Sequence, residues 1–256
     1  MPAVFSRTLL ARSLAQVGAF AEGASIGAEA VQIAEVVKHP FGLTVAYYGV
    51  GFVALCQGNL PRAIAELERS LAVCRARSIG DWFPYIASSL GIAYLLSGRR
   101  VEALPLLEEV VAQRAAMRGG RPTAFLVANL SEGYGLAGRL AEAKQFGQQA
   151  LEAAQAGKQQ GHQAYALRLL GQSAAYSDPP DVALAEAHYQ QALTLAEELG
   201  MSPLQAHCHR DLGTLYARIG QRERARTALT TAIELYRSMD MTFWLPQTET
   251  VLEALA

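Results

Sequence analysis

The feature that most constrains this chain is a pair of residues that returns about every forty positions. In each copy a large aliphatic residue precedes a small one, as in Leu90 and Gly91, and a turn glycine such as Gly98 follows seven residues later. The small residues of these pairs stand at positions 11, 51, 91, 131, 171 and 213, so the intervals are 40, 40, 40, 40 and 42. A regular period of this length predicts an array of repeated units, each packed on its neighbours.

A second marker, in the later half of each unit, has the same period. It falls at Ala30, Ser70, Val110, Ala150, Ala192 and Ala232, with intervals of 40, 40, 40, 42 and 40. The two extra residues lie between Gly171 and Ala192, where the segment 178–181 lengthens a turn. Length is therefore added in a loop, where chains tolerate it, and the repeated elements keep their register.

Each unit is predicted to contain two antiparallel helices. The turn glycines at positions 18, 58, 98, 138 and 220 suit the left-handed conformation that ends a helix. Asn59 and Pro61 then supply an N-cap and a first-turn proline for one second helix. Small residues recur because the two helices must approach closely, and no segment shows the period-two alternation of a half-buried strand. We expect Gly51, Gly91, Gly171 and Gly213 to meet Ala63, Ala103, Ala185 and Ala225.

The register predicts an all-α chain folded as a right-handed superhelical solenoid. We expect one domain over residues 1–256, with six helix pairs over residues 3–38, 41–78, 81–118, 121–158, 161–200 and 203–240. A capping helix over residues 242–255 should cover the last pair, because the end of an array otherwise leaves an apolar face in water. Pro105 falls inside a second helix, where it should produce a local kink. The chain opens and ends in predicted helices, which favours a segment of a longer protein.

Composition narrows the function classes. The sequence has 22 Lys and Arg against 23 Asp and Glu, and this balance argues against nucleic acid as a partner. Its three cysteines have no CxxC spacing and are interpreted as reduced thiols. We see no signal peptide and no stretch long and apolar enough to cross a bilayer. We therefore expect a cytoplasmic chain with no membrane partner.

No motif for catalysis or metal binding passes its geometric test. Gly23, Ser25 and Gly27 match the nucleophile-elbow pattern, but they fall inside a predicted helix, whereas the elbow needs a strand before its serine. His207 and His209 are two residues apart on a predicted helix, so their side chains diverge by about 200° and one ion cannot take both. We expect one of them to be packed and the other exposed. The sequence thus predicts no enzyme, no cofactor and no metal.

The order Leu-Gly-x-x-Tyr, turn glycine, alanine resembles the tetratricopeptide repeat over the whole chain. It is clear at Leu90, Gly91 and Tyr94, and the usual repeat of that family has about 34 residues, so these units are a longer form. That long form resembles repeats in bacterial multidomain signalling proteins. The family's closing proline is absent, and its early tryptophan is replaced by Arg7, Tyr47, Ala87, Val127, Leu167 and His209.

A narrower resemblance covers the C-terminal part of the chain. Segments 198–209, 212–216 and 239–245 are similar to the C-terminal repeat region of bacterial proteins that carry a class III adenylate or guanylate cyclase domain and an ATPase domain. The repeats of those proteins are taken to be sensory or regulatory. Neither catalytic module is present in this chain, so the resemblance implies a signalling context and no chemistry.

The family resemblance also implies where a partner binds. In tetratricopeptide proteins the first helix of each unit lines a concave groove, and three rows of residues occupy the corresponding positions here. The rows turn polar toward the C-terminal end, which favours a groove, because a core stripe would stay apolar. The alternative is that the aromatic residues are core. The predicted groove residues are Tyr48, Phe52, Tyr85, Ile92, Phe125, Tyr165, Arg168, Gln172, His207 and Arg210.

Two functions are compatible with this groove. The first is a scaffold for a peptide or partner domain that has apolar anchors and an acidic group. The second is a ligand-responsive sensor module that controls an attached cyclase or ATPase domain. The family's chaperone-tail clamp is not matched, because Thr8, Arg12 and Gly49 stand where it has Lys or Asn. Homo-oligomers would form through the exposed ends of the array.

Overall fold

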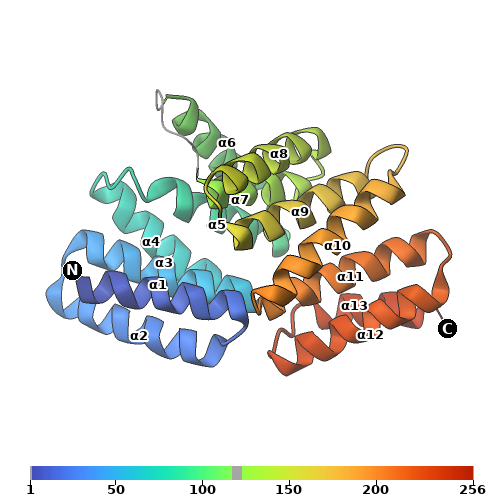
Figure 1. The fold of residues 1–256 in the computed structure, drawn as a ribbon. Helices are drawn as coiled ribbons and strands as arrows, with labels where there is room; N and C mark the ends of the chain where they lie inside the picture. The colour runs from blue at the N-terminus through green and yellow to red at the C-terminus, as the bar shows by residue number, and fades with distance from the viewer. Residues whose placement is uncertain (1, 117–122, 256) are drawn as a thin grey trace. The chain divides into compact units, whose positions relative to one another are not determined.

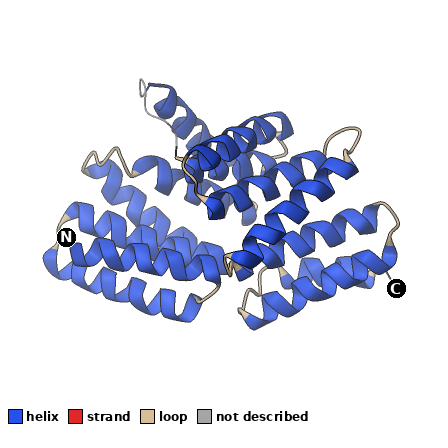
Figure 2. Cartoon of the chain, viewed as in Figure 1, coloured by secondary structure: helices blue, strands red, loops and turns tan. Residues whose placement is uncertain are grey.

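The computed structural model describes residues 2–116 and 123–255, and all regular structure within these ranges is helical (Figures 1 and 2). Thirteen helices lie in the described residues, arranged as sequential pairs followed by a last single helix. This confirms the predicted all-α helical repeat. The handedness of the superhelix stays a prediction, and the predicted boundary at residues 118–121 lies outside the described residues.

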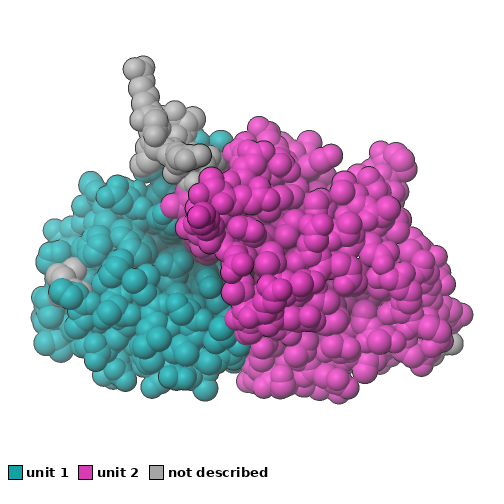
Figure 3. All heavy atoms as spheres, in the orientation of Figure 1, with its two compact units in different colours: residues 1–120 teal, residues 121–256 magenta. Residues whose placement is uncertain are grey.

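The chain divides into two compact units, residues 1–120 and residues 121–256 (Figure 3). In unit 1, each helix packs on the next along the chain, and the first helix of a pair also packs on the first helix of the pair before it. Its helices are α1 (Pro2–Val17), α2 (Phe20–Val37), α3 (Pro40–Gln57), α4 (Leu60–Ala76), α5 (Phe83–Leu96) and α6 (Arg100–Ala116). Helix α6 continues through Pro105, and the kink there stays a prediction.

Unit 2 repeats the same packing of consecutive helices and of successive first helices. Its pairs are α7 (Ala124–Leu136) with α8 (Leu140–Ala156), α9 (Gln160–Ala175) with α10 (Val182–Glu198), and α11 (Ser202–Arg218) with α12 (Arg222–Ser238). The last helix, α13 (Leu245–Glu253), follows α12.

The turns inside the pairs are built as predicted. The glycines that end the first helices have φ values between 74° and 88°, where a residue with a Cβ is strained. The Asn59 side chain caps α4 by accepting a hydrogen bond from the backbone N–H of Arg62 at 3.3 Å. The turn glycines with these positive φ values are Gly18, Gly58, Gly98, Gly138 and Gly220.

The close approach within each pair is also present, but its partner differs from the prediction. A Cβ on Gly213 would lie 2.6 Å from Leu229 Cγ, and a Cβ on Gly51 would lie 2.7 Å from Leu67 Cγ. The blocking residue therefore stands four positions after the expected alanine. A helical side chain leans toward the N-terminus and covers the turn before its own Cα, which explains this displacement. Gly91 and Gly171 meet Leu107 and Tyr189 in the same way, and Gly91 also meets the predicted Ala103, whose carbonyl oxygen lies 3.6 Å from the Cβ position.

The tyrosine of the repeated sequence connects successive helix pairs. The Tyr94 hydroxyl on α5 donates a hydrogen bond to Glu68 Oε1 on α4 at 2.6 Å, and the Arg99 guanidinium lies 4.0 Å from the ring centre. Burial, together with Glu68, raises the pKa of Tyr94 to about 12. In unit 2, Tyr216 donates to Glu186 on the preceding second helix at 2.9 Å. The repeated tyrosine therefore forms a hydrogen bond between successive pairs in addition to packing within its own pair.

Helix α3 corrects one expectation. Its 18 residues have a mean hydropathy of 1.2, so by length and composition it could cross a membrane. However, 72% of this stretch is buried inside the structure, where α3 packs on α1, α2 and α4. A helix that is apolar on all sides is expected in a protein core as well as in a bilayer. Its burial indicates a core helix.

Helix α13 begins in the way a first helix begins. Trp82 and Trp244, the two tryptophans of the sequence, are the N-cap residues of α5 and α13, and a proline follows in the first turn of each helix. Both helices pack on the second helix and the first helix of the preceding pair. Helix α13 thus occupies the place of a first helix. Leu255 follows it and is buried in the core of unit 2.

Candidate functional site

The residues of the predicted groove differ widely in exposure. In unit 1, Tyr48, Phe52 and Ile92 are buried, and Tyr85 is half-buried. In unit 2, Arg168 is buried with 3% of its surface exposed. The remaining predicted residues are half-buried: Phe125, Tyr165, Gln172, His207 and Arg210. A partner could contact these half-buried side chains without any rearrangement of the core.

In unit 1 the first helices gather aromatic side chains around Trp82, and we call this group the Trp82 cluster. The Trp82 ring centre lies 5.5 Å from that of Tyr48, 5.9 Å from Tyr85, 6.2 Å from Phe41 and 6.3 Å from Phe5. Helices α1, α3 and α5 each contribute to it. Phe5 is 41% exposed, and Phe41, Trp82 and Tyr85 are half-buried. The cluster therefore has a buried base and an accessible aromatic edge.

Three members of this cluster, Phe5, Phe41 and Trp82, are not among the predicted groove residues. Phe41 and Trp82 lie outside the three rows of first-helix positions, close to the start of α3 and α5. The sequence feature that could have identified them is an aromatic residue at the start of a helix, next to a proline in its first turn, as in Trp82 before Pro84. Arg12 on α1 places its guanidinium 5.2 Å from the Tyr48 ring centre and 5.0 Å from that of Phe52. Such distances are typical of cation–π contacts.

In unit 2 the first helices gather charged side chains around Asp211, and we call this group the Asp211 network. Arg168 Nε and Gln172 Nε2 donate hydrogen bonds to Asp211 Oδ2 at 2.8 and 3.0 Å. Arg210 Nη2 and Nε donate to Asp211 Oδ1 at 2.8 and 3.1 Å. Glu132 lies 3.6 Å from Arg168 Nη1. Asp211 therefore connects α9 with α11, and Arg168 on α9 connects in turn to Glu132 on α7.

The charges of the network stabilise each other. Burial by itself would raise the pKa of Asp211, but the facing Arg168 and Arg210 more than offset burial, so the pKa is lowered. Burial would likewise lower the pKa of Arg168, yet Asp211 and Glu132 raise it. A buried charge that is paired and hydrogen-bonded is tolerated in a core. Arg168 therefore shows that a polar residue in these rows need not be exposed, contrary to the reasoning that favoured a groove.

Asp211 itself was not among the predicted residues. It occupies the register position where the other units have Leu9, Gly49, Ser89, Asn129 and Leu169, and this position is buried at Gly49, Ser89 and Leu169. An acidic residue at such a position, with Arg210 beside it, is the signal that could have identified a buried ion pair.

His207 is held beside this network by aromatic contacts. Its Nδ1 lies 2.7 Å from the Tyr236 hydroxyl, and its ring centre lies 4.7 Å from that of Trp244. Burial, Arg168 and Arg210 lower its pKa well below the usual value, so the imidazole is neutral at physiological pH. His207 and His209 are both half-buried, so the expectation of one packed and one exposed histidine was wrong.

Two further motifs were tested against the structure. No group of three His, Cys, Asp or Glu side chains that could hold a metal ion occurs in the part of the chain that the structure describes. Gly23, Ser25 and Gly27 lie inside α2, with no strand before them, so the geometry of a nucleophile elbow is not formed.

Comparison with known proteins supports the repeat fold. Residues 181–238 match the tetratricopeptide repeat family. No curated protein matches the chain in sequence. NprR in complex with its cognate peptide NprX has a similar structure, with a TM-score of 0.67, 15% identity, and coverage of 98% of this chain and 72% of NprR.

Two other solved structures are similar over most of their length. BtubC (BKLC) from P. vanneervenii has a TM-score of 0.56 and 18% identity, over 88% of this chain and 91% of that chain. A putative kinesin light chain with nearly identical TPR-like repeats, from Podosopora anserina, has a TM-score of 0.52 and 22% identity, over 79% and 96% of the two chains. At these identities the likeness shows the fold alone. The chain is a tetratricopeptide-like helical repeat.

Proposed function

We propose that this chain is a non-catalytic scaffold that binds a peptide or a segment of a partner protein on the exposed faces of its first helices. The observation that carries this proposal is the Trp82 cluster, where three successive first helices present one accessible aromatic edge. Large aromatic side chains that are already packed from below lose little conformational freedom on binding, and they dominate many interfaces. Repeat modules of this fold typically bind proteins or peptides, and the NprR–NprX complex is an example with a peptide.

The chemistry of the two units suggests what such a segment contains. The Trp82 cluster suits apolar or aromatic anchors. In the Asp211 network, Arg210 uses Nε and Nη2 on Asp211, and within the described residues its Nη1 has no partner and is not a buried atom. A carboxylate is the acceptor that a guanidinium binds best, because the hydrogen bond is charge-assisted. We infer a ligand that combines apolar anchors with an acidic group.

A displayed peptide library selected on the full chain tests this proposal. We expect enrichment of peptides that contain an aromatic or large aliphatic residue and an Asp or Glu. Tyr85→Ala should weaken a selected peptide by about tenfold or more, as expected for an interface hot spot. Arg210→Gln, which keeps an N–H donor near Asp211, should weaken acidic peptides and leave their amide analogues unaffected.

The matched control is Tyr176→Ala. Tyr176 is an aromatic residue that is 51% exposed at the C-terminal end of α9 and lies outside the Trp82 cluster; it lines a small pocket together with Asp211 but is not a hydrogen-bonded member of the Asp211 network. Its removal should leave peptide affinity unchanged. If no peptide is enriched, or if the selected peptides respond equally to Tyr85→Ala and Tyr176→Ala, the exposed first-helix faces are not the binding surface.

A second candidate function is a ligand-responsive regulatory module within a bacterial signalling protein, controlling an attached cyclase or ATPase domain. Its signalling context rests on the sequence resemblance of the C-terminal part, and a cavity between α4, α5 and α6 favours it. With either function we propose a cytoplasmic location, where the three cysteines would stay reduced. In a fusion to a class III cyclase domain, a ligand of the repeats should change cyclase turnover. The same turnover with and without the ligand would contradict this candidate.

A further inference from the structure

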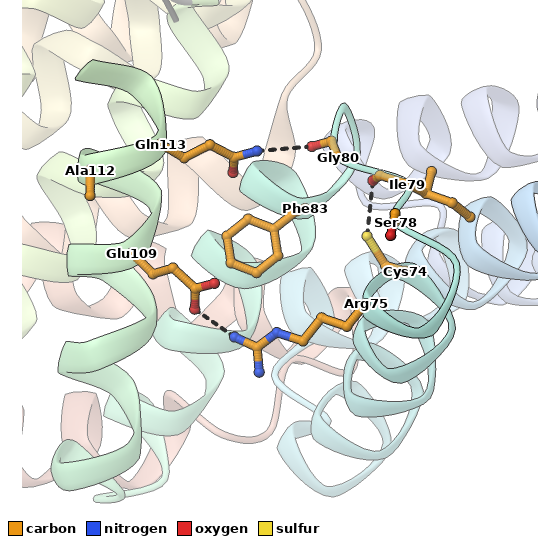
Figure 4. Close-up of a pocket in the computed structure, with 9 residues that line it drawn as sticks. All are labelled: Cys74, Arg75, Ser78, Ile79, Gly80, Phe83, Glu109, Ala112 and Gln113. Carbon is orange, nitrogen blue, oxygen red and sulfur yellow. Dashed lines mark hydrogen bonds and ion pairs between the residues drawn. The ribbon is translucent and has the colours of Figure 1, made fainter. Parts of the chain in front are cut away.

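A cavity of about 340 Å³ lies in unit 1 between α4, α5 and α6 (Figure 4). Its walls come from the end of α4, the following turn, the start of α5 and the C-terminal half of α6. The lining residues are Cys74, Arg75, Ser78, Ile79, Gly80, Phe83, Glu109, Ala112 and Gln113. The volume is at the lower end of the range typical of small-molecule sites. The cavity lies where one helix pair meets the next and is separate from the Trp82 cluster in its residues.

One lining residue departs from the repeat pattern. Gln113 stands three positions after the second-helix marker, and the other units have an apolar residue at that position. These residues are Ile33, Val73, Ala153, Leu195 and Leu235. A polar residue that breaks an otherwise apolar register has no packing advantage, and such local exceptions are expected at functional sites.

The orientation of the Gln113 amide is determined by its neighbour. Its Nε2 donates a hydrogen bond to the Gly80 carbonyl oxygen at 3.3 Å, and a carbonyl can only accept, so the nitrogen must be on that side. The oxygen is then turned away from Gly80, on the side of Phe83 and Glu109 (Figure 4). Gln113 Oε1 is buried and has no hydrogen-bond partner among the residues that the structure describes. A buried acceptor without a donor is unfavourable, and a ligand N–H or O–H would satisfy it.

The remaining walls restrict the charge and shape of a ligand. Phe83, Ile79 and Cys74 supply apolar surface, and the Cys74 thiol donates to the Ile79 carbonyl oxygen at 3.1 Å. Arg75 Nη2 and Glu109 Oε2 form an ion pair at 2.5 Å across one side of the cavity (Figure 4). Because these two charges neutralise each other, the cavity offers no net charge to a charged ligand.

We propose that this cavity binds a small uncharged molecule that has an apolar body of one or two rings and donates one hydrogen bond to Gln113 Oε1. The proposal concerns a different surface from the peptide-binding faces and does not depend on them. A bound molecule would contact both α4 and α6, so it would brace two successive helix pairs of unit 1.

Indole is a suitable probe, because it is uncharged, apolar and carries one N–H donor, and 1-methylindole is the matched control without the donor. We expect indole added to the full chain to shift the backbone amide resonances of Ile79, Gly80 and Ala112. The affinity of 1-methylindole should be lower by about tenfold, the cost of leaving one buried acceptor unpaired. In Gln113→Leu the two molecules should bind with similar affinity.

Two variants keep the result interpretable. Gln113→Leu places at this position the residue that stands at Leu195 and Leu235, so it should fold, and its thermal melt checks that it does. Ala112→Phe adds a ring to the cavity from an exposed position and should abolish binding of both molecules. The proposal is overturned if neither molecule shifts these resonances up to its solubility limit, or if wild type binds both equally. It is also overturned if Gln113→Leu keeps the preference for indole, or if Ala112→Phe leaves indole binding intact.

Discussion

At the scale of single residues, the absence of a side chain at Gly213 sets how closely α11 and α12 approach. A Cβ there would lie 2.6 Å from Leu229 Cγ and 3.1 Å from the Leu229 backbone nitrogen. The second contact is with backbone, so a rotamer change of Leu229 cannot relieve it. The same geometry at Gly51 and Leu67 explains why the small residue recurs with the repeat.

Gly213→Ala should therefore lower the free energy of unfolding by about 1–3 kcal/mol, the usual cost of overpacking a core. Gly135→Ala is the control, because a Cβ at this helical glycine would lie 3.8 Å from Ala143 Cβ, an ordinary contact. That substitution should be neutral or stabilise the helix by up to about 1 kcal/mol. Urea unfolding of both variants measures the difference. Equal destabilisation by both would mean that loss of glycine, rather than close packing, is responsible.

Asp211 is the other residue whose removal should have a large effect, because it accepts hydrogen bonds from the buried guanidinium of Arg168 and from the half-buried guanidinium of Arg210. Asp211→Asn should lower the free energy of unfolding at neutral pH by about 3–5 kcal/mol, since it removes the carboxylate that accepts a hydrogen bond from Arg168 and leaves only Glu132, 3.6 Å away, as a charged partner. The folded-state pKa of Asp211 lies below its ordinary value of 3.8, so its contribution is present above that pH and is lost as the pH falls below it.

The difference in free energy of unfolding between wild type and Asp211→Asn should consequently be smaller when unfolding is measured at about pH 3 than at neutral pH. Asp81→Asn, a substitution at an exposed aspartate, is the control and should change the stability little at either pH. If the difference in free energy of unfolding between wild type and Asp211→Asn does not change with pH, the carboxylate charge does not stabilise the network.

At the scale of elements, α13 shows how one helix position serves two purposes. It is placed as a first helix would be, and it also covers the end of the last pair. Trp244 is buried against His207 and Tyr236, and Leu255 is buried in the cluster that includes Ala225 and Leu229. The predicted capping segment therefore contains a nine-residue helix with a buried residue on each side of it.

Deletion of residues 242–256 should remove the burial of Trp244 and Leu255, worth about 1.5–3 kcal/mol for each side chain. A thermal melt should show this as a decrease of several degrees in the midpoint, or as aggregation through the exposed face. Thr250→Ala, at an exposed position of α13, is the control and should leave the melt unchanged. An unchanged melt after the deletion would mean that α13 does not stabilise the last pair.

At the scale of the whole molecule, the repeat pattern explains why the fold was predictable and the site was not. Within each unit, each helix packs on its neighbours along the chain, so the sequence spacing that defines a pair also defines most of its contacts. The residues that form the Trp82 cluster and the Asp211 network come from different pairs. Arg168 and Asp211, for example, are 43 positions apart. Contacts of this kind are specific to one copy of the repeat and leave no periodic signal.

The sequence by itself determined the all-α class, the pairing of helices, the left-handed turn glycines and the close approach at Gly213. These properties follow from local backbone preferences and from a sequence pattern that recurs in six successive units. Only the tertiary structure decided which first-helix residues are accessible. It buried Tyr48, Phe52 and Ile92 in the core, buried Arg168 beside an aspartate, and exposed part of a cluster around Trp82. The physical reason is that burial depends on what lies opposite a side chain, and in a repeat array that neighbour belongs to another pair.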